Sequence, residues 1–182
     1  MKRCEWAQRT TLERDYHDTE WGKPLHDDEK LFEMLTLESM QAGLSWSTII
    51  KKRAAMRIAF DQFDYRKIAM YDEEKMTELL NNPEIIRHRG KIAAMINNAQ
   101  QYMHIQQEYG SFDMYIWSFV NHQPQMNHWE TMEEIPATTE TSIEISKSLK
   151  KAGFKFVGPT SIYALMQSIG MVNDHLESCD YK

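Results

Sequence analysis

Long apolar runs, a set of disulfide-forming cysteines and a positive net charge are all missing from this sequence of 182 residues. No hydrophobic stretch is long enough to cross a bilayer, and the first residues, Met-Lys-Arg-Cys-Glu-Trp, lack the apolar core of a signal peptide. The two cysteines, Cys4 and Cys179, are too few for a disulfide scaffold. We therefore expect a cytoplasmic protein without a membrane partner.

A net charge of -6 argues at first against a polyanionic partner, but the charges are unevenly distributed. The segment from Ile145 to Asn173 contains no Asp or Glu and carries several lysines, among them Lys155. Two further basic clusters lie at Lys51-Lys52-Arg53 and at Arg87-His88-Arg89-Gly90-Lys91. A basic face on an acidic protein can bind nucleic acid, although each cluster alone is more often a solvated helix face.

Helical periodicity dominates the chain, and strand signals are weak. The only alternation, at Phe154-Lys155-Phe156-Val157, is short and ends at Gly158-Pro159. The polar segment from Asn121 to Pro136 is expected to be a loop. With 42% hydrophobic residues and no linker, the chain is predicted to form one all-α domain over 1–182. The expected helices are Asp28–Ala42, Trp46–Phe60, Asp72–Asn81, Gly90–Tyr109, Ser111–Phe119, Thr139–Ala152 and Thr160–Ser168.

An acid interrupts the apolar stripe of the first expected helix. Leu31, Met34 and Leu35 follow the spacing of a buried face, and the next position on that face is Glu38. A buried carboxylate needs a partner, so Glu38 either bonds a neighbouring helix or arginine, or forms the floor of a pocket that recognises a donor or a positive charge. Four aromatic residues early in the chain could form such a pocket or an ordinary core: Trp6, Tyr16, Trp21 and Trp46.

Potential metal ligands stand near both ends of the chain. Cys4 and His17 lie near the start, and His175 and Cys179, four residues apart, can face one side of a helical turn near the end. Two thiolates and two imidazoles form a tetrahedral set that suits zinc, and four protein ligands would make the ion structural. The alternative is two unrelated cysteines and two ordinary histidines, because this spacing matches no zinc finger.

A proline-containing turn precedes a basic segment between Asn82 and Ile92. A tight turn that opens a helix presents backbone amides to a phosphate, and flanking basic residues strengthen the attraction. This is the arrangement of a helix-hairpin-helix. An ordinary pair of antiparallel helices with a solvated basic corner fits the residues equally well.

Taken together, the motifs resemble the DNA-3-methyladenine glycosylase I family, over residues 3–179. The residues that carry the resemblance are Cys4, Tyr16-His17-Asp18, Glu20-Trp21-Gly22, Leu31-Phe32-Glu33, Gln41-Ala42-Gly43-Leu44-Ser45-Trp46, Lys51-Lys52-Arg53, Arg87-His88-Arg89-Gly90-Lys91, Trp117-Ser118-Phe119-Val120-Asn121, Gly153-Phe154-Lys155-Phe156-Val157-Gly158, Asn173-Asp174-His175 and Cys179.

The resemblance implies an all-α fold of the helix-hairpin-helix superfamily in which one structural Zn²⁺ joins the segments 1–25 and 171–182. It implies a monofunctional DNA repair glycosylase that acts on double-stranded alkylated DNA. The enzyme would flip the damaged nucleotide, hydrolyse the N-glycosidic bond of 3-methyladenine, and leave an abasic site. 3-Methylguanine is a plausible further substrate. A monomer without an obligate protein partner is expected.

The roles of single residues also follow from the resemblance. The zinc ligands would be Cys4, His17, His175 and Cys179. Glu38 and Tyr16 would recognise the base and act in catalysis, with Trp46 and Trp6 as aromatic walls and Trp21 close by. Gln41, Gly43 and Leu44 would fill the gap left by the flipped nucleotide. The remaining DNA contacts would be Arg87, Arg89, Gly90, Lys91 and Lys155.

Two positions depart from the family pattern. Glu13 stands where some members have a tyrosine, and Glu84-Ile85 replaces a Gly-Ile pair often found in the hairpin. The first change is expected to remove an aromatic contact to the base, and the second sets an acid near the phosphates and puts a left-handed turn in doubt. Two other functions remain to be separated from the glycosylase: a non-catalytic sensor of alkylated DNA, and a zinc-dependent hydrolase of small molecules.

Overall fold

Helices account for most of the chain in the computed structural model, which describes residues 1–182. The α-helices are α1 (Thr11–Thr19), α2 (Asp28–Met40), α3 (Trp46–Ala59), α4 (Tyr65–Ile68), α5 (Glu73–Leu80), α6 (Arg89–Tyr109), α7 (Phe112–Ser118), α8 (Glu140–Lys151) and α9 (Pro159–Ser168). Three short 3-10 helices are η1 (Glu5–Gln8), η2 (Asp61–Phe63) and η3 (Met132–Glu134). The two-residue strands β1 (Gln125–Met126) and β2 (Val172–Asn173) pair in parallel. The expected all-α fold is confirmed.

Polar side chains that accept the first free backbone amides determine where most helices begin. Ser45 accepts from the amide of Thr48 at the start of α3, and Asp72 does the same for Lys75 at the start of α5. The start of α2 is capped by Asp27. The neighbouring Asp28 instead accepts hydrogen bonds from the amides of Phe112 and Asp113, so the carboxylate of one helix caps the distant helix α7.

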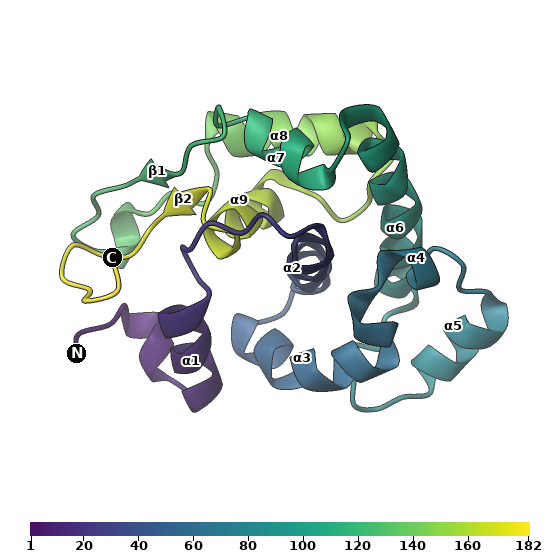
Figure 1. Cartoon of the computed structure of the whole chain (residues 1–182). Helices are drawn as coiled ribbons and strands as arrows, with labels where there is room; N and C mark the ends of the chain where they lie inside the picture. The colour runs from purple at the N-terminus through teal and green to yellow at the C-terminus, as the bar shows by residue number, and fades with distance from the viewer.

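The central helix of the fold is α2, which lies nearly end-on in the middle of Figure 1 with α9, α6 and α3 around it. Every residue from Leu31 to Met40 is buried, so the helix has no solvated face. The sequence predicted one buried face for α2, whereas the structure buries the helix on all sides. A helix enclosed on all sides must also bury its polar residues, and Glu33, Thr36, Glu38 and Ser39 are among them.

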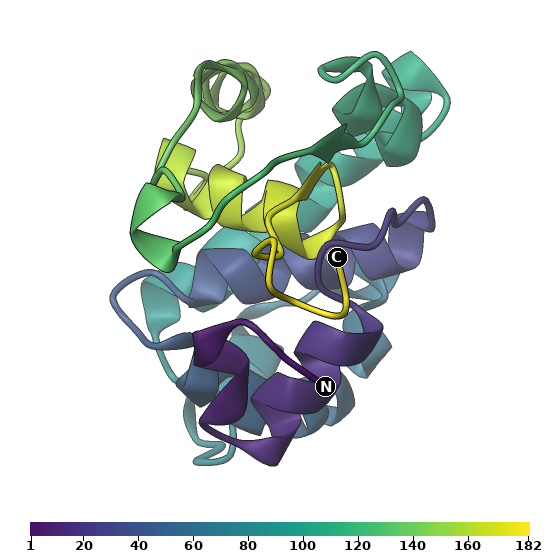
Figure 2. The ribbon, with the colours of Figure 1, turned by 90° about the vertical axis from the view of Figure 1, so that its left-hand side faces the viewer.

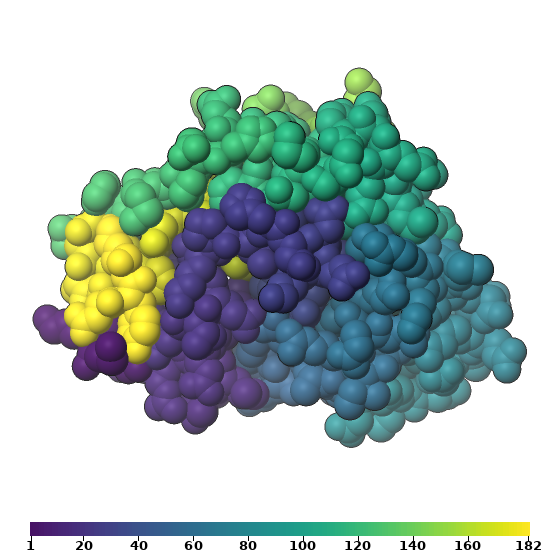
Figure 3. All heavy atoms as spheres, in the orientation of Figure 1, coloured from purple at the N-terminus to yellow at the C-terminus, as the bar shows by residue number.

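The first and last segments of the chain lie side by side. Figure 2 shows both ends on the face turned toward the viewer, and in Figure 3 the yellow residues of the C-terminal segment pack against purple residues of the N-terminal one. The backbone amide of Lys2 donates to Asp180 at 2.8 Å, and the amide of Asp180 donates to the carbonyl of Lys2.

None of the helices combines the length and hydrophobicity that a transmembrane span requires.

The seven expected helices all occur, with ends within two residues of the predicted ones. The short helices α1 and α4 were not predicted. The segment from Asn121 to Pro136 is mainly irregular, but it also contains β1 and η3. The alternating Phe154–Val157 segment forms no strand; it is the loop between α8 and α9, in which Phe156 has a φ of 55°.

Candidate active site and metal centre

The buried acid of α2 lies in a cavity. Glu38 is 5% exposed, and its Oε2 atom has no hydrogen-bond partner. Because burial disfavours the charged form, the pKa of Glu38 is raised to about 8. Neither an arginine nor a backbone amide bonds Oε2, and an unpartnered carboxyl group in the interior costs free energy. The arrangement suits a ligand that supplies a donor or a positive charge.

Aromatic rings from three separate segments surround this carboxyl group. Tyr16 of α1 packs against Trp46 at the start of α3, with 4.9 Å between the ring centroids. Trp6 of η1 lies 6.2 Å from Tyr16 and 5.1 Å from Trp21, again between centroids. The indole nitrogen of Trp46 is buried without a partner. Burial and the nearby Glu38 carboxylate raise the pKa of Tyr16 well above its usual value, so its phenol stays protonated and can donate a hydrogen bond.

The cavity between these groups has a volume of about 230 Å³, which suits a single heterocyclic ring system better than a larger ligand. Two acids line it, Glu13 and Glu38, and Arg9 is its one basic residue. The structure therefore brings together all five pocket residues expected from the sequence. The complete lining is Trp6, Arg9, Glu13, Tyr16, Trp21, Glu38, Gln41, Ser45, Trp46, Ser47, Met132, Ala164 and Gln167.

Next to the cavity, the chain leaves α2 in an apolar tip. Gly43 is exposed and has a φ of +75°, a conformation that other residues adopt only with strain. Leu44 is 39% exposed, and Gln41 is half-buried. A second hollow of about 220 Å³ lies between this tip and the start of α9, lined by Leu44, Thr160 and Ser161 among others. The tip and the N-terminus of α9 thus form adjacent parts of one surface.

The basic corner at 87–91 adjoins the same tip. Lys91 is only 8% exposed, and its Nζ donates to the carbonyls of Met40 at 2.8 Å and Ala42 at 2.6 Å. Lys91 therefore binds the C-terminal carbonyls of α2, where a cation is favourable. Arg89 is exposed and pairs with Glu73, while Arg87 and Gly90 are exposed at the start of α6.

The residues 152–158 join α8 to α9 in a tight hairpin that carries Lys155, one of the expected DNA contacts. Gly153 has a φ of +91°, and Gly158 caps α9 without a side chain, which leaves the first amides of α9 without a side-chain acceptor. Asn98 of α6 fixes the loop by bonding both the amide and the carbonyl of Lys155, at 2.8 and 2.9 Å. In the sequence, Gly153, Gly158 and Pro159 mark this hairpin as a tight turn before a helix.

Four buried ligand groups from the two ends of the chain meet beside the aromatic wall. The candidate ligand atoms of Cys4, His17, His175 and Cys179 all lie within 4.8 Å of one another. The Sγ atom of Cys179 is 3.6 Å from Nε2 of His17 and 3.4 Å from Nδ1 of His175. The expected clustering of these four residues is confirmed, and the group could hold a metal ion.

Hydrogen bonds to the outer ring nitrogens orient both histidines. The Nδ1 atom of His17 lies 2.8 Å from the Asp18 carboxylate, which is itself held by two nitrogens of Arg3. The Nε2 atom of His175 lies 3.0 Å from the carbonyl of Trp21. Because these outer nitrogens face acceptors, they carry the protons, and the inner nitrogens present lone pairs to the centre.

The protonation of this cluster depends on a positive charge at its centre. Burial raises the pKa of the Cys4 thiol to about 12 and lowers the pKa of His175 to about 4. Both shifts disfavour charged groups in the interior. A bound cation reverses this for thiols, since coordination stabilises the thiolate. The ligand set has two sulfur donors, two nitrogen donors and no carboxylate, and such a set fits a soft or borderline metal ion.

The two departures from the family pattern have different surroundings. Glu13 is 2% exposed at the cavity, where its Oε2 accepts from the hydroxyl of Thr10 at 2.9 Å while its amide donates to the same hydroxyl. Glu84 is exposed on the turn before α6. No residue from 82 to 91 has a positive φ, so the turn does not require a glycine at position 84.

Comparison with known proteins agrees with this architecture. The sequence pattern of the methyladenine glycosylase family matches residues 6–182. The chain belongs to this family. It is 51% identical to DNA-3-methyladenine glycosylase 1 of Escherichia coli (strain K12) over 179 residues, which are 98% of this chain and 96% of the relative. It is 47% identical to the DNA-3-methyladenine glycosylase of Haemophilus influenzae, over 99% and 97% of the two chains.

A solved structure gives the same result. The crystal structure of a Y16F variant of 3-methyladenine DNA glycosylase I in complex with 3-methyladenine superimposes with a TM-score of 0.96, at 38% identity, over 100% of this chain and 98% of the other. The family resemblance, the helical fold and the expected class of enzyme, a glycosylase, are thereby confirmed.

Proposed function

We propose that this enzyme hydrolyses the N-glycosidic bond of 3-methyladenine in alkylated double-stranded DNA. It would flip the nucleotide out of the helix, release the free base and leave an abasic site. One observation carries the proposal: the Oε2 atom of Glu38 is buried without a hydrogen-bond partner among aromatic rings, in a chain whose relatives are named for this activity. A cationic base with an exocyclic amine would supply both the charge and the donor that the cavity lacks.

Base recognition would be shared between Glu38, Tyr16 and Trp46. Glu38 accepts from the exocyclic amine or the ring edge of the base, and Tyr16 donates or accepts a second hydrogen bond. Trp46 stacks on the ring, where attraction between the cation and the aromatic face contributes about 0.5 to 2 kcal/mol. Trp6 and Trp21 complete the walls. The low volume of the cavity, about 230 Å³, favours purines whose exposed edge carries no bulky group.

Catalysis would come mainly from electrostatic stabilisation. 3-Methyladenine is cationic while bound to the sugar, so its glycosidic bond is already weakened, and no proton needs to be added to the leaving group. No aspartate lines the cavity, which agrees with a mechanism without a strong general base. The Glu38 carboxyl group ionises against the cationic base and stabilises the positive charge as it passes from the base to the sugar. The glycosidic bond breaks toward the neutral free base, and water then attacks the sugar and releases a proton to solvent.

The DNA surface would consist of three adjacent parts. The tip at Gln41, Gly43 and Leu44 fills the space left by the flipped nucleotide, which explains why apolar groups are exposed there. The start of α6, with Arg87, Arg89 and Gly90, contacts phosphates on one side. The loop at Lys155 and the free amides of α9 do the same next to the tip. Lys91 acts by holding the end of α2 in place.

The metal is proposed to be one structural Zn²⁺. Two thiolates and two neutral imidazoles are the donor set that zinc prefers, and four protein ligands leave no open position for a substrate. When bound, the ion supplies a positive charge that keeps Cys4 and Cys179 deprotonated. The residues themselves then hold η1 and α1, which carry Trp6 and Tyr16, against the C-terminal segment. We further propose a single domain that acts as a monomer; a cytoplasmic location stays a prediction.

Mass spectrometry of the bases released from methylated DNA tests the proposal and separates the alternatives. The glycosylase should release 3-methyladenine without added metal and in the presence of a chelator. A sensor would bind the DNA and release nothing, and a catalytic zinc hydrolase would lose its activity with the chelator. Glu38→Gln and Tyr16→Phe should both slow release, and full activity in both variants would exclude the assigned pocket. The same spectra report whether 3-methylguanine is also released.

A further inference from the structure

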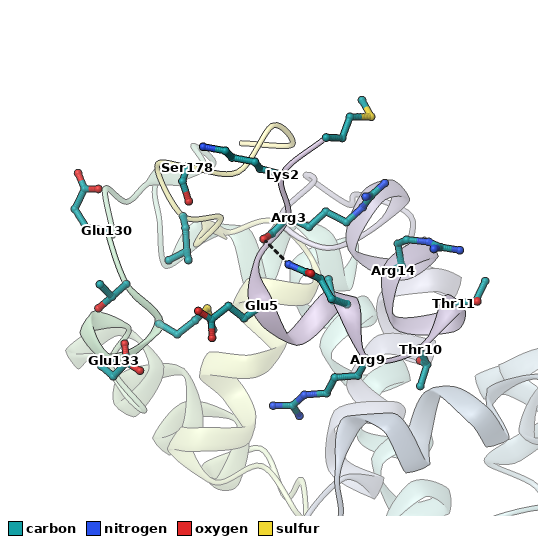
Figure 4. A pocket seen from close by; sticks show the side chains of 16 residues that line it. Lys2, Arg3, Glu5, Arg9, Thr10, Thr11, Arg14, Glu130, Glu133 and Ser178 are labelled. Carbon is teal, nitrogen blue, oxygen red and sulfur yellow. Dashed lines mark hydrogen bonds between the residues drawn. The ribbon is translucent and has the colours of Figure 1, made fainter.

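Arg9 has a position that neither the metal centre nor the proposed base contacts explain. It ends η1 and lines two cavities at once, the base cavity and a larger hollow of about 850 Å³. Met132 is the only other residue that lines both cavities. In Figure 4, the Arg9 side chain extends away from Arg14 and Lys2. Since Arg9 is exposed to solvent and also lines the base cavity, it lies at the cavity mouth.

The guanidinium group of Arg9 has no interaction partner within the protein. It is exposed and forms no ion pair and no side-chain hydrogen bond, although neighbouring arginines do. Arg3 is held by Asp18, Arg14 lies 3.8 Å from Asp15, and Arg53 is bound by Glu20 and Glu33. Glu13, an acid that lines the same cavity, accepts a hydrogen bond from Thr10 through its Oε2 and forms no ion pair with Arg9. Arg9 is therefore free to bind an anion without first breaking an internal contact.

The charges at the two ends of the base cavity are complementary to a nucleotide with a cationic base. The buried end of the cavity carries the Glu38 carboxyl group, and the mouth carries a cation. A cationic ligand without an anionic group would be attracted by the first and repelled by the second. A nucleotide whose base is cationic and whose backbone is anionic has the opposite order of charges, so it is complementary to both ends of the site at once.

We propose that Arg9 binds a phosphate next to the flipped nucleotide and so holds that nucleotide outside the helix. The inference rests on the proposed function and adds a positioning residue to it. Arg9 would contact the DNA across the cavity mouth from the tip at Gly43 and Leu44. The extruded backbone would then be bound on both sides of the flipped sugar, with guanidinium geometry suited to phosphate oxygens.

The test uses the full-length protein and a duplex that carries a tetrahydrofuran abasic site, which keeps the backbone and lacks the base. Arg9→Gln should weaken binding about 5- to 20-fold and reduce the salt dependence of the association constant by about one phosphate contact, measured between 50 and 200 mM salt. Arg14→Gln is the matched control, since Arg14 is exposed and close in sequence but does not line the base cavity. It should change binding less than twofold.

A second measurement separates phosphate binding from a purely structural role. Binding of free 3-methyladenine, followed by tryptophan fluorescence, should be unchanged in Arg9→Gln, because the free base is neutral and carries no phosphate. Equal DNA affinity and equal salt dependence in Arg9→Gln and Arg14→Gln would overturn the proposal, as would a parallel loss of base binding in Arg9→Gln. Failure of the proposed function is distinguishable, because the wild-type protein would then release no base from methylated DNA.

Discussion

Replacing Glu38 by Gln should stabilise the protein at alkaline pH while it impairs the site. The pKa of this carboxyl group is raised from 4.5 to about 8 in the folded protein. Below pH 4.5 both the folded and the unfolded chain hold the proton. Between these two values the unfolded chain releases it and the folded chain keeps it, so wild-type stability falls as the pH rises. Above pH 8 the loss is complete.

The size of the effect follows from the same two values. The pKa differs by about 3.5 between the unfolded value of 4.5 and the folded value of about 8, which corresponds at most to a loss of about 5 kcal/mol in the free energy of unfolding. Water entering the open cavity reduces this, and we expect about 2 to 4 kcal/mol. The amide of the Glu38→Gln variant is neutral at every pH, so the free energy of unfolding of the variant does not fall in this way.

Urea unfolding of both proteins at several pH values between 5 and 8.5 measures the difference. The Glu38→Gln variant should gain about 2 to 4 kcal/mol over wild type across this range, and most of the gain should appear below pH 8. Glu144→Gln on the exposed surface of α8 is the control and should follow the wild-type curve. A gain that does not change with pH, or a variant that is less stable at pH 8.5, would refute the reasoning, because Glu38 would then be ionised and satisfied in the folded state.

Three further perturbations test other parts of the structure. Cys179→Ala should lose the bound metal in elemental analysis and lower the free energy of unfolding by about 3 kcal/mol or more; a metal-free variant with an unchanged melting temperature would contradict a structural ion. Tyr16→Phe should reduce the rate of 3-methyladenine release about 10- to 100-fold in single-turnover assays, with less than 1 kcal/mol change in stability, because it removes one hydrogen bond to a charged base. Lys91→Met should cost about 2 kcal/mol in urea unfolding, since the carbonyls of Met40 and Ala42 lose their shared donor, and an unchanged stability would mean that water replaces Nζ.

The helices that sequence alone predicted carry apolar residues on their buried sides. Helix α1 is amphipathic but was missed, because its buried residues are Glu13, Tyr16 and His17. These side chains face the base cavity and the metal cluster, so the buried side of this nine-residue helix has no aliphatic stripe. Strands β1 and β2 escaped prediction because two residues carry no alternation, and their partners are far apart in the sequence.

The candidate site was only partly predictable in the same way. An acid on a buried helix face marked Glu38, but its spacing could not decide between a structural partner and a pocket. The family resemblance supplied Tyr16 and the aromatic walls. Arg9 was not singled out by either route, because neither its sequence neighbours nor the family motifs distinguish it from other surface arginines. Its significance depends on which cavities it borders and on the absence of an ion pair, and both are properties of the folded chain.

The clustering of Cys4 with Cys179 also bears on the order in which the base cavity forms during synthesis. The residues of the aromatic wall, Trp6 and Tyr16, leave the ribosome early, whereas His175 and Cys179, which lie in the same cluster as Cys4 and His17, are synthesised much later. Until the C-terminal segment is added, the wall that carries Trp6 and Tyr16 lacks the residues that pack behind it. The proposed extrusion of a base therefore has no complete cavity to enter at that stage.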